Sequence, residues 1–323
     1  MLTLVDFIVP SATLAIATSA QWFFGGDTSG FLGLGGALLA RLWYTASSEP
    51  TTYSPLFVQM YTEGLISPQF TLALSQRGGY IALGAVSMSS SFADDERLHL
   101  NGTQTCTSVN SHTHGVARSA QLACQRNAHP QRYDERQSSH ETLRGPRFDK
   151  NHTRTSVEMP SAWTAVPMPA YSVGPPIVSG FYAVEVQTLR LSTRGGATVS
   201  VPYSMPMIVD SGTSALILPA RLAAAVNSLW NPRPDPLDGS LPCDVGAFRR
   251  IPRLGFTLAN DTFWIDPQTL ITRYEDGTCG AAVVGAEGDE PLILGTPFLM
   301  NVVAVFDVGD QVLRLKSTYP EQL

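Results

Sequence analysis

The 323 residues contain no uninterrupted apolar run long enough to cross a membrane. The most apolar segment, 1–20, is interrupted by Asp6 and Pro10 and has no Lys or Arg, so it lacks the basic start of a secretory signal peptide. No hydrophobic tail precedes Leu323, so a lipid-anchor signal is not expected. We predict a strand within 1–20, no visible signal peptide and no membrane span.

Basic residues are also scarce. The 21 Lys and Arg are outnumbered by 27 Asp and Glu, and the net charge of −6 argues against nucleic acid as a partner. Turn-forming residues are abundant, with 27 Gly and 23 Pro, which is typical of a β-rich architecture with many short connections. A chain of this length can bury two cores.

The most informative segment is an apolar run that ends in an acid. Residues 207–209 predict a buried strand, which leads directly into Asp210, Ser211, Gly212 and Thr213. Glycine permits a tight turn, so the acid is held on a short loop with hydroxyl and amide donors near its oxygens. A carboxylate placed in this way can act as a general acid or base on a bound water. The tetrad alone is a weak signal, because an ordinary strand-to-turn transition uses the same residue types.

Further motifs in a fixed order give the tetrad its context. A helical segment at 219–226 follows it, then Leu292-Ile293-Leu294-Gly295-Thr296, and then an apolar run from Val302 that ends at Phe306-Asp307. In order and content, these features resemble the C-terminal lobe of the pepsin-like aspartic proteases (peptidase A1), over about 163–316. Four upstream segments resemble the back part of that family's N-terminal lobe: 30–35, 55–61, 68–75 and 78–84.

The resemblance implies a mostly β fold, namely a bilobal pepsin-like double β-barrel whose first lobe is incomplete. It divides the chain into a partial N-terminal lobe (1–87), an inserted low-order segment (88–157) and a C-terminal lobe (158–323). It also implies a disulfide between Cys243 and Cys279 and therefore an oxidising compartment, either secreted or the vacuolar lumen.

The same resemblance implies the function and its residues. The expected activity is that of an aspartic-type endopeptidase, which cleaves an extended peptide or protein substrate with a carboxylate-activated water and needs no cofactor and no metal. Asp210 is the expected catalytic residue, and Ser211, Gly212 and Thr213 support its loop. Leu294 and Gly295 form the strand beside the loop. A monomer is expected.

The chemistry of this family uses two carboxylates that share a proton, one from each lobe. The 323 residues contain one Asp-Ser-Gly and no Asp-Thr-Gly, and no flap tyrosine hairpin precedes Phe31. Asp27, in Asp27-Thr28-Ser29-Gly30, is a weaker candidate for the partner acid, because its glycine comes one place late.

Three interpretations follow from the single tetrad. The chain is a truncated or mis-assembled protease, which we favour; or it has lost catalysis and is a peptide-binding or inhibitory protein; or two chains each contribute one Asp. The retained half of the first lobe would obstruct such a pairing.

Segment 88–157 does not fit the family pattern. It holds all six His and nine of the 21 Lys and Arg, and neither a strand nor a helix period persists in it, so we expect no regular structure there. Cys106, His112, His114 and Cys124 are zinc-ligand types, but their spacing fits no common zinc finger, and no metal site is predicted. Three triplets match the N-glycan acceptor pattern, beginning at Asn101, Asn151 and Asn260.

Overall fold

The structure is a computed structural model of the chain, and strands dominate it. It describes residues 2–4, 7–9, 12, 32–36, 39, 41–42, 51–75, 78–85, 98–99, 104–109, 121–126, 163–173, 178–192, 198–230, 233–235, 239–243, 253–274 and 277–318. Helices in these residues are α1 (Leu56–Thr62), α2 (Ala220–Ser228), α3 (Thr296–Leu299) and the 3-10 turn η3 (Pro267–Leu270). The prediction of a mostly β fold is confirmed.

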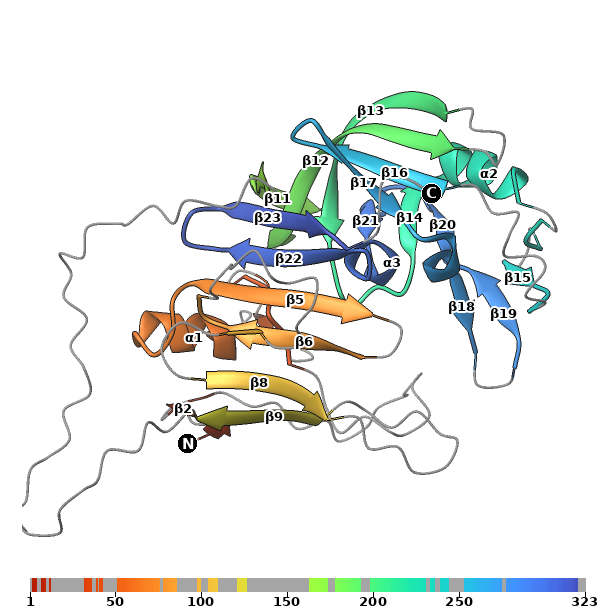
Figure 1. Ribbon diagram of the computed structural model, residues 1–323. Helices are drawn as coiled ribbons and strands as arrows, with labels where there is room; N and C mark the ends of the chain where they lie inside the picture. Colours follow the sequence, from red (N-terminus) through yellow and green to blue (C-terminus); the bar gives the residue numbers. More distant parts are fainter. Residues whose placement is uncertain are drawn as a thin grey trace, which may run out of the picture.

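A five-stranded antiparallel sheet combines strands that come before segment 88–157 with strands that come after it. Its order is β10 (Thr164–Pro167), β23 (Val312–Ser317), β22 (Val302–Asp307), β5 (Gln69–Ser75) and β6 (Gly78–Leu83). Figure 1 shows the orange β5–β6 hairpin beside the blue β22–β23 hairpin. The segments predicted to belong to two different lobes therefore share one sheet.

An eight-stranded sheet forms the other body of the molecule. Around β12 (Val178–Ser192) lie β16 (Arg253–Leu258) with β17 (Asp261–Ile265) on one side and β13 (Thr198–Val209) on the other. The sheet continues through β21 (Ile293–Leu294), β14 (Leu216–Pro219) and β20 (Val283–Ala286), and β11 (Ala170–Val173) also pairs with β12. Most pairs are antiparallel, but β13–β21 and β14–β20 are parallel. The short strand β21 is thereby enclosed between β13 and β14.

Smaller sheets complete the described elements. They are β15 (Ser240–Leu241), β19 (Cys279–Ala281) and β18 (Ile271–Arg273); β1 (Leu2–Leu4) with β2 (Phe7–Val9); β3 (Arg41–Leu42) with β4 (Thr51–Thr52); and β7 (Leu98–His99), β8 (Gln104–Val109) and β9 (Gln121–Arg126). The strand predicted within 1–20 is confirmed as the β1–β2 hairpin.

The expectation that 88–157 has no regular structure was wrong for three short stretches, because β7–β9 pair with one another within it. Neither β8 nor β9 shows a long apolar pattern, so their pairing left no period to read in the sequence. The division of the chain at 87 and 157 stays a prediction.

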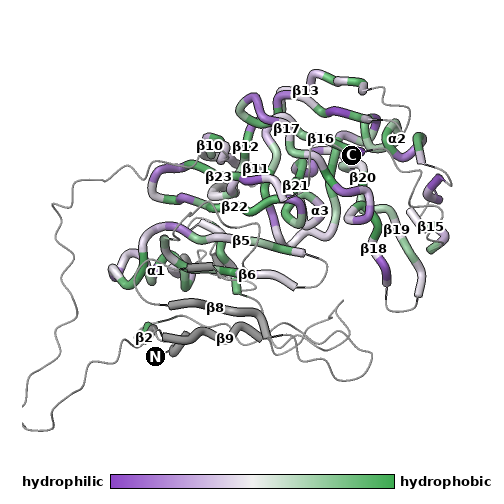
Figure 2. Tube along the Cα trace, in the orientation of Figure 1, coloured by the Kyte–Doolittle hydropathy of each residue, from purple (hydrophilic) through white to green (hydrophobic). Residues whose placement is uncertain are grey.

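One hydrophobic core extends through both sheets. Phe57 of α1 and Phe70 of β5 belong to the same buried cluster as Phe306 of β22. The rings of Phe70 and Phe306 stack with their centroids 4.5 Å apart, and Phe57 meets Phe70 edge-on at 5.1 Å. Figure 2 shows apolar stretches meeting around β5, β22 and α3. Aromatic stacking across the β5–β22 pair therefore holds the two hairpins of the shared sheet together, and Phe57 packs α1 against that sheet.

A buried carboxylate also connects the two hairpins of the shared sheet. Asp307, only 2% exposed, accepts hydrogen bonds from Gln69 Nε2 at 2.8 Å and Arg314 Nη2 at 3.1 Å. The Asp310 amide donates to its other oxygen at 2.9 Å. These partners compensate the cost of burying the charge. Within the described residues, no helix combines the length and apolar character that a membrane crossing requires.

Candidate active site

The loop that carries Asp210 lies where the short strand β21 passes between β13 and β14. β13 ends at Val209, the loop follows, and β14 begins at Leu216, with β21 paired to both strands. The Asp210 amide donates to the Leu294 carbonyl at 3.1 Å, which continues the β13–β21 pairing into the loop. Val209 and Leu294 are buried, so the apolar run before Asp210 anchors the loop in the core. The acid is thus carried by a rigid support.

Two donors hold the Asp210 carboxylate. The Gly212 amide donates to Oδ1 at 2.8 Å, and the Thr213 hydroxyl donates to Oδ2 at 2.6 Å. Asp210 itself is half-buried, whereas Ser211 is exposed beside it. A Cβ at Gly212 would lie 3.2 Å from Oδ1, so a side chain at this position would crowd the carboxylate. Each oxygen keeps room for a further partner, because a carboxylate oxygen accepts more than one hydrogen bond.

Gly295, which follows β21, allows the backbone at the end of this strand to approach the Asp210 loop closely. A Cβ there would lie 2.2 Å from the Ala215 carbonyl oxygen and 2.4 Å from the Thr213 carbonyl oxygen, which leaves no room for a side chain. The Thr296 amide donates to the Thr213 carbonyl at 2.8 Å and ties the strand to the loop. The structure therefore brings the predicted residues of the tetrad together with Leu294 and Gly295.

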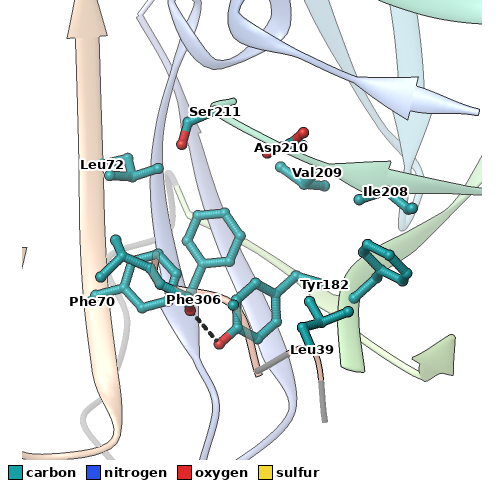
Figure 3. A pocket seen from close by; sticks show the side chains of 12 residues that line it. Leu39, Phe70, Leu72, Tyr182, Ile208, Val209, Asp210, Ser211 and Phe306 are labelled. Atoms are coloured by element: carbon teal, nitrogen blue, oxygen red, sulfur yellow. Dashed lines mark hydrogen bonds between the residues drawn. The ribbon is translucent and has the colours of Figure 1, made fainter. Parts of the chain in front are cut away.

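A cavity of about 170 Å³ opens beside the acid. In Figure 3, Asp210 and Ser211 lie at one end of the cavity, and the rings of Phe70, Phe306 and Tyr182 lie toward the other. The complete lining is Leu34, Gly35, Leu39, Phe70, Leu72, Phe181, Tyr182, Ile208, Val209, Asp210, Ser211 and Phe306. It combines residues from both ends of the chain and contains one carboxylate.

Tyr182 is a lining residue that the sequence did not indicate. Its hydroxyl donates to the Leu34 carbonyl at 2.9 Å, across 148 positions of sequence. Burial, with Tyr61 nearby as a smaller cause, raises the pKa of the Tyr182 phenol above its usual value. Tyr182 stands in an ordinary alternating strand, so no local signal could have revealed this contact.

The remaining predicted residues are placed as follows. Cys243 and Cys279 form the expected disulfide, with their Cα atoms 5.4 Å apart, so this prediction is confirmed. Asp27, His112 and His114 lie outside the described residues, and of Cys106 and Cys124 only the backbone is described, where they are opposite each other in β8 and β9. Where the structure describes side chains, it groups no three His, Cys, Asp or Glu as a metal would need.

Comparisons with known proteins agree with this geometry. A family model described as "Eukaryotic aspartyl protease" matches residues 163–317. A protein of Aspergillus fumigatus named "Probable aspartic-type endopeptidase" is 25% identical over 96% of this chain and 58% of its own length. Rhizopuspepsin-1 of Rhizopus niveus is 35% identical over 40% of this chain and 31% of its own length. The chain thus spans 58% and 31% of these two relatives.

The fold has a solved counterpart. The crystal structure of an aspartic proteinase from Irpex lacteus superposes with a TM-score of 0.59 over 98% of this chain and 75% of that protein, at 16% sequence identity. At this identity the likeness shows the pepsin-like fold alone. The loop geometry, the family match and the two relatives agree: residues 163–317 of this chain match the eukaryotic aspartyl protease family, which is peptidase A1.

Proposed function

We propose that this chain takes part in aspartic-type endopeptidase catalysis, with Asp210 as one of two carboxylates that activate a water molecule. The observation that carries the proposal is the fixed Asp210 carboxylate, which the Gly212 amide and the Thr213 hydroxyl orient at the end of an apolar cavity. Ser211, exposed beside it, is available to bond to the loop that carries the second acid.

The reaction needs one ionised and one protonated carboxylate at the same time. The ionised group removes a proton from water, the water oxygen bonds to the scissile carbonyl carbon, and the protonated group donates its proton to the carbonyl oxygen. Collapse of this tetrahedral species breaks the C–N bond and transfers a proton to the leaving amine. Two carboxylates in contact share one proton because both cannot ionise cheaply, which supports activity at acidic pH.

The substrate we propose is an extended peptide, bound by main-chain hydrogen bonds and by apolar contacts with its side chains. The apolar cavity lining supports this choice. The disulfide supports a secreted or vacuolar location, because such bonds persist in oxidising compartments. We propose a monomer that acts without a cofactor, since the chemistry requires only carboxylates and water.

One observation favours a second candidate function, a non-catalytic peptide-binding or inhibitory protein. Among the described residues that line the cavity, Asp210 is the one carboxylate. The second acid must therefore come from Asp27, from another undescribed residue, from polypeptide beyond these 323 residues, or from a second chain. If none of these supplies it, the cavity can bind a peptide but cannot hydrolyse it.

A cleavage and binding assay separates the two functions. The full chain is incubated at acidic pH with a peptide library and, in parallel, with a hydroxyl-bearing transition-state mimic. Asp210→Asn should abolish cleavage, whereas Asp289→Asn, a matched change at an exposed acid outside the site, should leave it unchanged. If Asp27→Asn also abolishes cleavage, Asp27 is the partner acid.

Binding of the mimic without cleavage would support the second function. Cleavage that survives Asp210→Asn, or a chain that neither cleaves nor binds, would refute the proposed catalytic role of Asp210.

A further inference from the structure

The hairpin between β16 and β17 presents an asparagine to solvent. Asn260 lies at the turn, is exposed, and has a φ of 76°, while Ala259 before it has a φ of 47°. Two consecutive residues with positive φ are typical of the tight turn that joins two antiparallel strands. The side-chain amide of Asn260 makes no hydrogen bond to the described residues, and its backbone amide donates to the Gln187 side chain at 3.1 Å.

This asparagine begins the triplet Asn260-Asp261-Thr262, which matches the N-glycan acceptor pattern. We propose that Asn260 is an N-glycosylation site that carries an oligosaccharide on its Nδ2 atom. The modification is independent of proteolysis and does not rest on the function proposed above. Of the three acceptor triplets, the one at Asn260 lies within the described residues, and those at Asn101 and Asn151 lie outside them.

Two independent observations support the site. A folded chain can carry a sugar only where there is free space for it, and Asn260 is exposed at the turn between β16 and β17. The Cys243–Cys279 disulfide is typical of a chain in an oxidising compartment, and N-glycans are added on the secretory route that leads there. The position and the compartment therefore agree.

The chemistry is a group transfer without oxidation or reduction. The donor is an oligosaccharide linked through pyrophosphate to a lipid. The bond between its anomeric carbon and the pyrophosphate oxygen breaks, a bond from that carbon to Asn260 Nδ2 forms, and the amide nitrogen loses one proton. The lipid pyrophosphate is the leaving group. The acceptor pattern includes the Thr262 hydroxyl, and in the folded hairpin this hydroxyl is within hydrogen-bond distance of the Thr257 hydroxyl, at 3.1 Å. Because that contact occupies the Thr262 hydroxyl, we expect transfer to precede closure of the hairpin.

A glycan at this turn leaves the candidate active site open. Gln187, which contacts Asn260, lies six residues along β12 from Phe181 in the cavity lining, roughly 20 Å at the rise of a strand. The sugar would instead stand at the start of β17, which is an edge strand of the eight-stranded sheet. A bulky polar group beside an unpaired edge disfavours pairing with another chain.

The test is peptide mapping of the full chain, secreted from a eukaryotic host behind a cleavable leader. Trypsin releases Leu254–Arg273, in which Asn260 is the one asparagine. Treatment with a peptide N-glycosidase should convert Asn260 to Asp in this peptide, and the untreated sample should contain it in sugar-bearing form. Asn260→Gln and Thr262→Ala should each abolish the sugar-bearing peptide, whereas Thr262→Ser should retain it because the hydroxyl is kept.

The competing explanation is that Asn260 is present only because asparagine tolerates a left-handed turn. Asn260→Gly keeps that turn and removes the acceptor, so its secreted chain serves as a folded, sugar-free reference. The proposal is overturned if a secreted wild-type chain, with its Cys243–Cys279 bond formed, yields Leu254–Arg273 only in unmodified form.

Discussion

Replacing Gly295 with Ala should damage stability and cleavage together, because backbone atoms already fill the space that a Cβ requires. The added carbon would lie 2.2 Å from the Ala215 carbonyl oxygen and 2.4 Å from the Thr213 carbonyl oxygen. Rotation of a side chain cannot relieve either contact, since both partners are main-chain atoms. β21 and the Asp210 loop must therefore separate by roughly 1 Å to restore ordinary contact distances.

The cost follows from what this separation disturbs. Overpacking of this kind costs about 1–3 kcal/mol. The shift also strains the hydrogen bonds from the Asp210 amide to Leu294 and from the Thr296 amide to Thr213, each worth about 1 kcal/mol net. We expect Gly295→Ala to lower the free energy of unfolding by about 3–5 kcal/mol. Since the Asp210 backbone moves with the loop, cleavage should fall about 100-fold, as a 1 Å misplacement can produce.

Urea unfolding followed by tryptophan fluorescence measures the first effect, and the acidic peptide assay measures the second. Gly33→Ala is the matched control, because nothing among the described residues lies within 4 Å of its added Cβ and its φ is not positive. The reasoning is refuted if Gly295→Ala unfolds within about 0.5 kcal/mol of the wild type, the usual range for a surface change.

Three further predictions concern the supports of the site. Replacing both Cys243 and Cys279 with Ser should lower the free energy of unfolding by about 3–4 kcal/mol, because the disulfide closes a loop with a sequence separation of 36. An unchanged urea midpoint would contradict this prediction. Asp307→Ala should lower the free energy of unfolding by about 3–5 kcal/mol, because it leaves Arg314 without its buried partner. The control Asp310→Ala should lower it by less than about 1 kcal/mol, because that ion pair is more exposed. Equal losses in the two variants would disprove the argument. Burial raises the pKa of the Tyr182 phenol, so as pH rises above about 10 this phenol ionises in the unfolded chain before it ionises in the folded one. The free energy of unfolding should therefore fall with rising pH in this range. Urea titrations at several pH values should show a shallower fall for Tyr182→Phe.

The Asp210 loop and its crossing strand could be read from the sequence because each is encoded locally. An apolar run before Asp210 and another before Gly295 predicted two buried strands, and the family resemblance paired them. The disulfide followed from the same resemblance. By contrast, 88–157 offered no pattern, and the three strands found there were missed because their residues alternate weakly between apolar and polar.

The sequence by itself determined that the chain is mostly β, that it carries an acid on a tight loop, and which family its C-terminal part resembles. Only the tertiary structure decided that β5 pairs with β22, that Phe70 stacks on Phe306, and that Tyr182 bonds to Leu34. These contacts join residues separated by more than a hundred positions, so no local period or turn signal encodes them. The physical reason is that burial is non-directional: an apolar strand can be recognised from its residues, but its partner is selected by the shape and register of the whole core.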